Sequence, residues 1–215
     1  MSQNQDVQQT PATPSALDPA AALERLVQGN ERFAKGETAP RITSPGLLEH
    51  LAEAQHPFAT ILGCSDSRVP PEMLFDQGLG DLFIVRVAGN VLGSETLGSM
   101  AYALEHLRTP LFVVLGHENC GAVRAALETK VRGAKYHARL APLLNEILPA
   151  LEGIDHTQSF ESQMRYAVEA NVRLELRHLA ATPGGRTALA EGRIQLVGAI
   201  YELETGKVRF LEENL

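Results

Sequence analysis

The sequence predicts an α/β domain whose central, mainly parallel sheet has about four strands plus one edge strand, with helices on its flanks. Three short apolar runs, at 58–62, 82–87 and 111–115, are nearly uninterrupted. Such runs are typical of strands that are buried on both faces of a parallel sheet. Helical stretches lie between them, at 93–107 and 120–130. Alternating strands and helices at this spacing indicate parallel pairing through right-handed crossovers.

The N-terminal part is predicted to be a tail followed by a helical arm. Residues 1–17 are polar and contain proline, which favours a flexible segment. A helix begins at Asp18 and Pro19, because Asp caps helix starts and Pro fits the first turn, and Gly36 ends it. We expect the apolar face of this helix to pack on a partner subunit. The chain is thus divided into the tail and arm (1–40) and an α/β domain (41–215).

The remaining elements follow from periodicity and turn residues. A second short helix begins at Ser44 and Pro45. After residue 130 comes a longer helical region that Gly184 and Gly185 should break. A strand over 193–202 is followed by a turn and an antiparallel edge strand over 207–211. The stripe predicted for the long helix consists of Met164, Val168, Val172, Leu176 and Leu179.

The amino-acid composition and the net charge exclude several classes of protein and of binding partner. The 215 residues are 44% hydrophobic and 21% charged, as expected for one ordinary globular domain. With 19 basic and 26 acidic side chains the net charge is −7, which argues against nucleic acid or an anionic membrane as the main partner. No run of 18 apolar residues is present, and residues 1–18 lack the apolar segment of a secretory signal. We therefore expect a cytoplasmic protein.

Two polar segments, GCSDSR (63–68) and GHENCG (116–121), each follow directly on a predicted buried strand. The carboxyl ends of parallel strands form the crevice in which α/β proteins bind ligands. Together the segments hold four candidate metal ligands, and their sulfur, nitrogen and oxygen donors suit tetrahedral Zn²⁺. These ligands are Cys64, Asp66, His117 and Cys120. The alternatives are two buried cysteines that only fill the core, or a redox pair, although no CxxC motif exists.

The phrases CSDSRVPPE, RVAGN and GHENCGAV, in this order, resemble the β-class carbonic anhydrases. The resemblance extends from the first helix to the last strands, and the stretch 130–192 contributes little to it. It implies that residues 41–215 form a zinc-binding catalytic domain that converts CO₂ and water reversibly into bicarbonate and a proton. It also implies Zn²⁺ on Cys64, His117 and Cys120, with water or Asp66 in the fourth position. The N-terminal arm would grip a partner in a homodimer or a higher homo-oligomer.

Further site residues follow from the spacing and from the resemblance. Arg68 lies two residues after Asp66, and a bidentate ion pair between them would keep Asp66 ionised and away from the metal. The alternative for this pair is a solvated turn. The resemblance suggests the Gln77 side chain as a donor to the reacting oxygen. Gly121 is a candidate backbone N–H donor at a helix start, and Gly89 is expected to shape the substrate pocket.

Some β-class enzymes also carry a non-catalytic bicarbonate site built from Trp, Arg and Tyr. By position Arg86 and Tyr201 could match two of these residues, but the Trp position is Ile61 and the chain contains no Trp. We therefore expect no site of that type.

Two alternative functions remain open at this stage. The same zinc chemistry could hydrolyse CS₂ or COS, or the chain could be a catalytically silent, zinc-stabilised interaction subunit. An intact Asp66–Arg68 pair argues against the silent subunit, because a purely structural zinc site does not need it.

Overall fold

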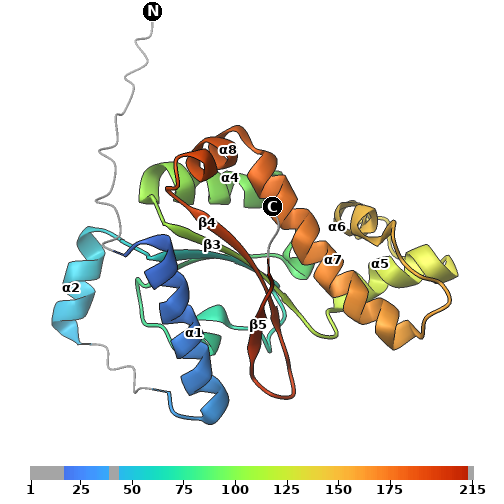
Figure 1. The fold of residues 1–215 in the computed structure, drawn as a ribbon, viewed down its shortest axis with the longest axis horizontal. Helices are drawn as coiled ribbons and strands as arrows, with labels where there is room; N and C mark the ends of the chain where they lie inside the picture. Colours follow the sequence, from blue (N-terminus) through green and yellow to red (C-terminus); the bar gives the residue numbers. More distant parts are fainter. Residues whose placement is uncertain (1–16, 39–43, 213–215) are drawn as a thin grey trace, which may run out of the picture.

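The computed structural model describes residues 17–38 and 44–212, and its centre is a five-stranded sheet in the order β2-β1-β3-β4-β5 (Figure 1). The strands β1 to β4 are parallel, and β5 runs antiparallel to β4 at one edge. This confirms the predicted sheet of four parallel strands with an added edge strand. The strands are β1 (Ala59–Gly63), β2 (Leu82–Arg86), β3 (Leu111–His117), β4 (Gln195–Tyr201) and β5 (Val208–Phe210).

The central strands are buried on both faces, as their continuous apolar runs predict. Every residue of β1 and β3 is buried, whereas the edge strand β2 is mostly half-buried. In the register of the sheet, Gly63 at the end of β1 lies between Arg86 of β2 and Leu115 of β3. The segments that follow β1, β2 and β3 therefore leave the sheet at the same edge.

Helices cover both faces of the sheet, and Figure 1 shows α1 and α7 on opposite sides of it. One face carries α1 (Pro19–Lys35) and α3 (Pro71–Leu74). The other face carries α4 (Ser94–Tyr102), the π-helical turn η2 (Ala103–Leu107), α5 (Gly121–Arg132), α6 (Ala141–Ile147), the 3₁₀ turn η3 (Leu148–Leu151), α7 (Phe160–Ala181) and α8 (Pro183–Ala190). The 3₁₀ turn η1 (Ala88–Asn90) follows β2, and α2 (Pro45–Glu53) has no buried residue. Among the described residues, no helix is both long and apolar enough to span a membrane.

The first helix begins and ends as predicted, but its apolar face has a different partner. The Asp18 carboxylate accepts the Ala21 N–H at 2.7 Å, and Gly36 ends the helix in the left-handed conformation. Ala22 and Leu26 are fully buried in the same core as strands β1, β3 and β4. The expectation that this face has no place on its own subunit is therefore wrong. The polar tail predicted for 1–17 lies outside the described residues except for Leu17.

The packing of α1 gives a testable prediction for stability. Leu26 is fully buried, so Leu26→Ala should lower the free energy of unfolding by about 2–5 kcal/mol, through lost burial and a residual cavity. Leu48 on α2 is half exposed, and Leu48→Ala should change the free energy of unfolding by less than about 0.5 kcal/mol. Urea denaturation of both variants measures the difference. If both substitutions lowered the free energy of unfolding by the same small amount, α1 would not pack on its own sheet.

The long helix α7 confirms the predicted stripe, but the predicted break is displaced. The helix ends at Ala181, and Gly184 and Gly185 lie inside the next helix, α8. Thr182 and Pro183 cause the break, because the Thr182 hydroxyl caps α8 and Pro fits its first turn. Gly185 allows the two helices to meet closely, since a Cβ there would lie 2.2 Å from the Leu179 carbonyl oxygen. The buried residues of α7 include all five stripe residues, Met164, Val168, Val172, Leu176 and Leu179.

Candidate metal centre

Three buried side chains converge beyond the carboxyl ends of the central strands. Cys64 follows β1, His117 is the last residue of β3, and Cys120 caps the start of α5. Each side chain offers one ligand atom, and these three atoms lie within 4.8 Å of one another. Cys64 and His117, 53 positions apart in the chain, are thus brought together by the pairing of β1 with β3, as the sequence predicts.

The His117 imidazole is oriented for ligation. Its Nδ1 lies 2.8 Å from the Glu118 carbonyl oxygen, and a carbonyl can only accept, so Nδ1 carries the proton. The other ring nitrogen, Nε2, therefore presents a lone pair. This atom is buried and has no hydrogen-bond partner among the described residues. Because a buried polar atom without a partner is costly, the arrangement points to an external partner at Nε2.

The two thiols lie against each other and against backbone N–H groups. Their Sγ atoms are 3.9 Å apart, and the Gly89 N–H donates to Cys64 Sγ at 3.4 Å. The hydrogen bond from Cys120, together with that from the Gly89 N–H, lowers the pKa of Cys64 to about 4. The same shared proton, aided by burial, raises the pKa of Cys120 above its usual range. The pairing therefore favours the thiolate form of Cys64, the form that ligates metal ions.

These donors fit a thiophilic metal ion of tetrahedral preference. Two sulfurs and one imidazole nitrogen form a three-ligand set, and three protein ligands with an open fourth position are the arrangement of catalytic zinc sites. The hydrogen bond from His117 Nδ1 to a backbone carbonyl is the support that ligating histidines receive in such sites.

Asp66 lies beside this cluster but is engaged by Arg68. Arg68 Nε donates to Asp66 Oδ1 at 2.9 Å and Arg68 Nη2 donates to Oδ2 at 2.8 Å, the bidentate pair that the spacing predicts. The Arg68 backbone N–H adds a third bond to Oδ1 at 3.0 Å. These bonds hold the pKa of Asp66 well below its usual range. Asp66 Oδ2 is 3.8 Å from His117 Nε2, so the carboxylate borders the candidate metal position.

Arg86 organises the backbone of the same loop, a role that sequence reasoning missed. Its Nε donates to the Cys64 carbonyl at 2.9 Å and its Nη2 donates to the Asp66 carbonyl at 2.7 Å. The sequence signal for this role was a positively charged side chain at the end of an apolar strand. Arg86 and Tyr201 lie in β2 and β4, with β1 and β3 between them, and the expected absence of a Trp-based bicarbonate site stays a prediction.

Comparisons with known proteins agree with this geometry. Residues 59–208 match the family model described as "Carbonic anhydrase". The chain is 39% identical over 198 residues to a carbonic anhydrase of Mycolicibacterium smegmatis, with 89% of this chain and 92% of that protein covered. The chain belongs to the β-class carbonic anhydrases.

Further relatives support the same membership. Carbonic anhydrase 2 of Mycobacterium tuberculosis is 38% identical over 195 residues, which cover 88% of this chain and 91% of that protein. Among solved structures, the β-carbonic anhydrase CcaA superposes with a TM-score of 0.71 at 28% identity, covering 88% of this chain and 95% of CcaA.

The three remaining site predictions occupy different environments in this carbonic anhydrase. Gly89 directs its N–H at Cys64, and Gly121 begins α5 directly after Cys120. Gln77 is buried, but its amide donates to the Phe75 carbonyl at 2.6 Å. A Cβ on Gly29 of α1 would lie 3.0 Å from that amide nitrogen, so Gln77 faces α1 here. The substrate-binding roles of Gln77, Gly89 and Gly121 stay predictions.

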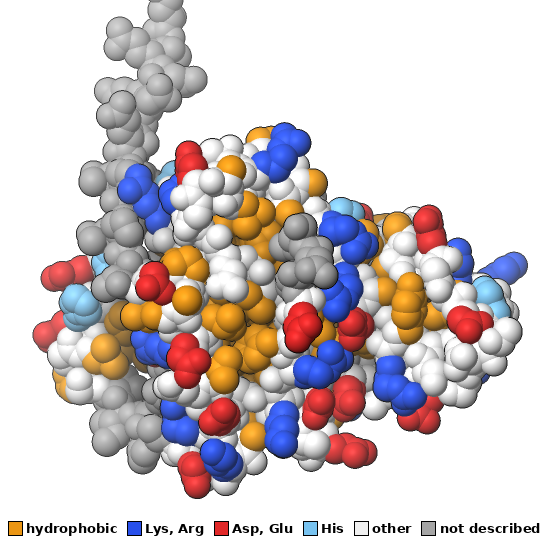
Figure 2. Space-filling model, in the orientation of Figure 1, with side chains coloured by type: hydrophobic (Ala, Val, Ile, Leu, Met, Phe, Trp, Pro, Cys, Tyr) orange, Lys and Arg blue, Asp and Glu red, His pale blue; other side chains and the backbone are white. Residues whose placement is uncertain are grey.

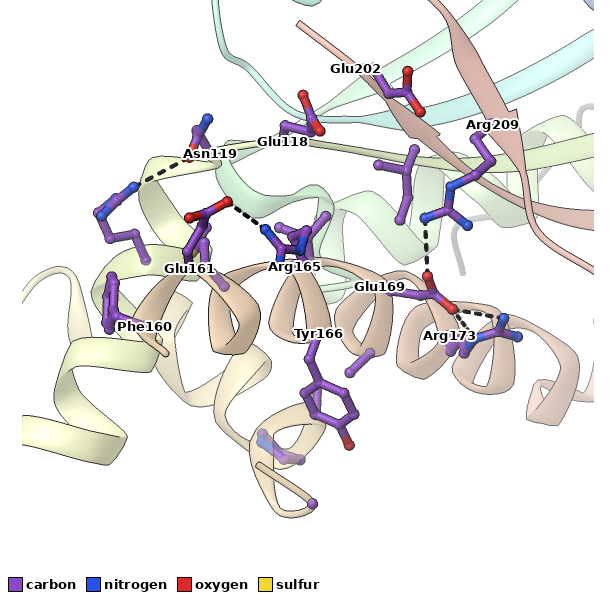
Figure 3. Close-up of a pocket in the computed structure, with 18 of the residues that line it drawn as sticks. Glu118, Asn119, Phe160, Glu161, Arg165, Tyr166, Glu169, Arg173, Glu202 and Arg209 are labelled. Carbon is purple, nitrogen blue, oxygen red and sulfur yellow. Dashed lines mark hydrogen bonds and ion pairs between the residues drawn. The ribbon is translucent and has the colours of Figure 1, made fainter. Parts of the chain in front are cut away.

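A large cavity of the molecule lies apart from the metal ligands. Its volume is about 1090 Å³, and it is bordered by α7, by Glu118 and Asn119 after β3, and by residues of β4 and β5 (Figure 3). Five arginines and five glutamates line it, and several pair with each other, as Glu169 does with Arg173 and Arg209. On the face shown in Figure 2, acidic and basic side chains are interspersed. Such surface pairs carry little energy and assign no ligand to the cavity.

Proposed function

We propose that this β-class carbonic anhydrase hydrates CO₂ reversibly to bicarbonate and a proton at a Zn²⁺ ion held by Cys64, His117 and Cys120. The observation that carries the proposal is the convergence of two sulfurs on the buried His117 Nε2, which has no hydrogen-bond partner in the part of the chain that the structure describes. When bound, Zn²⁺ lowers the pKa of a coordinated water from 15.7 to about 7 and so supplies a nucleophile at neutral pH.

Asp66 and Arg68 orient the reacting oxygen in this proposal. Asp66 borders the metal position, and its lowered pKa keeps it an acceptor at neutral pH. Arg68 occupies both carboxylate oxygens from the outer side and thereby fixes the plane of the carboxylate. Held in this way, Asp66 would accept a hydrogen bond from the reacting oxygen and would not itself ligate a metal bound by Cys64, His117 and Cys120. This bidentate geometry also argues against a catalytically silent subunit.

Backbone groups shape the space for a small apolar substrate. Gly89 has a φ of 72°, and a Cβ there would lie 2.9 Å from Ile147 Cδ1 and 3.1 Å from Ala122 Cβ. Only glycine therefore allows the backbone to approach the sulfur of Cys64 at this point. Gly121, at the start of α5, offers a backbone N–H where the helix dipole favours a developing anion.

Stopped-flow CO₂ hydration with a pH indicator tests the function. We expect fast hydration by the zinc-loaded protein, loss of activity with a chelator, and recovery on adding Zn²⁺. COS and CS₂ supplied to the same preparation separate the alternative hydrolases, and we expect CO₂ to be the preferred substrate. A folded, zinc-loaded chain that leaves the rate of CO₂ hydration at the uncatalysed value would refute the proposal.

We also propose a domain division, an oligomeric state and a cellular location. Every proposed site residue lies in 41–215, which supports this range as the zinc-binding catalytic domain, whereas 1–40 has a structural role. A homodimer or a higher homo-oligomer is supported by the resemblance and by exposed apolar side chains, among them Met73 at 63% and Leu79 at 59% exposure. A cytoplasmic location agrees with two free cysteines, because the cytosol keeps thiols reduced.

A further inference from the structure

We infer that Asn171 on α7 is a positioning residue for the metal centre. Asn171 holds the Gly89 backbone in the orientation in which the Gly89 N–H donates to Cys64 Sγ. This inference rests on the proposed zinc site. Asn171 does not touch a ligand and lies 54 positions after His117 in the chain.

Two hydrogen bonds connect Asn171 to Cys64 through the Gly89 backbone. Asn171 Nδ2 donates to the Gly89 carbonyl oxygen at 2.9 Å, and the Gly89 N–H donates to Cys64 Sγ at 3.4 Å. The Gly89 carbonyl is thus bound by Asn171 of α7, and the Gly89 N–H binds the sulfur of Cys64, the residue after β1. Asn171 is fully buried, so water does not compete for this hydrogen bond.

The segment between these two bonds needs an external support. Gly89 and Asn90 both have positive φ values, of 72° and 46°, and a non-glycine residue in this region is strained. Glycine also has the widest choice of backbone conformations, so it does not fix its own N–H direction. The Asn171 side chain of α7 supplies this support at the Gly89 carbonyl oxygen.

Packing alone does not explain an asparagine at this position. Asn171 adjoins the apolar stripe of α7, between the buried residues Val168 and Val172. Its Oδ1 atom is buried without a partner among the described residues, which costs free energy. A leucine of similar size would fill the space without that cost. What Asn171 adds is a directed hydrogen bond to Gly89.

The test compares Asn171→Leu with Gln163→Met, both on α7. Gln163 is the matched control, because it is also a buried amide that donates to backbone carbonyls, those of Asp155 and Gln158 at 3.0 and 3.2 Å, which are outside the site. Competition with a chelating dye measures Zn²⁺ affinity. We expect Asn171→Leu to weaken it by about tenfold to a hundredfold, as for other residues that support metal ligands, and Gln163→Met to leave it near the wild-type value. Co²⁺ substitution adds a readout of geometry, since the sulfur-to-cobalt charge-transfer band should shift only in Asn171→Leu.

A measurement on the wild-type chain keeps the inference testable if Asn171→Leu does not fold. In the protein loaded with ¹¹³Cd²⁺, the Gly89 amide proton should show scalar coupling to the metal through the N–H···S bond. Absence of that coupling, or a folded Asn171→Leu with wild-type Zn²⁺ affinity and an unshifted Co²⁺ band, overturns the inference and leaves the proposed function intact. A wild-type chain that binds no Zn²⁺ would instead overturn both.

Discussion

Replacing Cys64, His117 or Cys120 with alanine should empty the metal site and lower CO₂ hydration by about 10³-fold or more, since a bound metal contributes several kcal/mol to the transition state. All three side chains are buried and their ligand atoms converge within 4.8 Å, so each substitution removes one of the three protein donors from the site. Elemental analysis of the purified variants and stopped-flow hydration measure the two effects. The variants should also melt at lower temperature, because metal binding contributes to folding.

Thr60→Val is the matched control for these variants. Thr60 is fully buried on β1, four residues before Cys64, and its hydroxyl bonds to the Thr109 hydroxyl at 2.7 Å. Removing that hydroxyl should lower stability but leave the metal content unchanged. If Cys64→Ala retained a full equivalent of zinc and wild-type activity, the assignment of the metal centre would be wrong.

Much of the fold could be predicted from the sequence because its signals are local. The fully apolar runs of β1 and β3 indicate burial on both faces, and Asp18 and Gly36 mark the ends of α1. What α1 covers could not be predicted, because an apolar stripe shows that a helix is buried and does not show against which surface. The α7–α8 break was misplaced for a related reason. Gly185 serves a close approach to Leu179, which depends on tertiary structure and not on local flexibility.

The convergence of the three candidate metal ligands could be predicted, because two motifs follow adjacent parallel strands, where topology brings them together. The residues that support these ligands could not. Arg86 acts on the Cys64 and Asp66 carbonyls, and Asn171 acts on the Gly89 carbonyl. Backbone acceptors carry no sequence pattern, so such roles appear only in the folded chain. Polar residues inside an apolar strand or stripe are the remaining signal for them.

Replacing Arg68 with alanine should lower the rate of CO₂ hydration strongly but change the stability of the fold little. Two groups compete for the Asp66 carboxylate, the metal and Arg68, and in this structure Arg68 holds both oxygens. Without Arg68 the carboxylate, already 3.8 Å from His117 Nε2, is free to turn inward and take the fourth ligand position. We therefore expect Arg68→Ala to retain zinc and to lose about tenfold to a hundredfold in CO₂ hydration, the range typical of residues that support metal ligands. Asp66→Asn should also retain zinc, but its amide orients the reacting oxygen poorly.

Arg165→Ala separates this effect from the general loss of a surface ion pair. Arg165 pairs with Glu161 on α7, and its side chain is 60% exposed, close to the 54% of Arg68. Both substitutions remove an exposed arginine from a carboxylate, so their effects on melting temperature should be similarly small. Only Arg68→Ala should slow CO₂ hydration, because only Asp66 borders the metal position. Even without Arg68, an aspartate with the ordinary pKa of about 3.9 is ionised throughout pH 7 to 9, so the loss should persist across this range. Wild-type rates for Arg68→Ala over the same range would show that the pair has no part in catalysis.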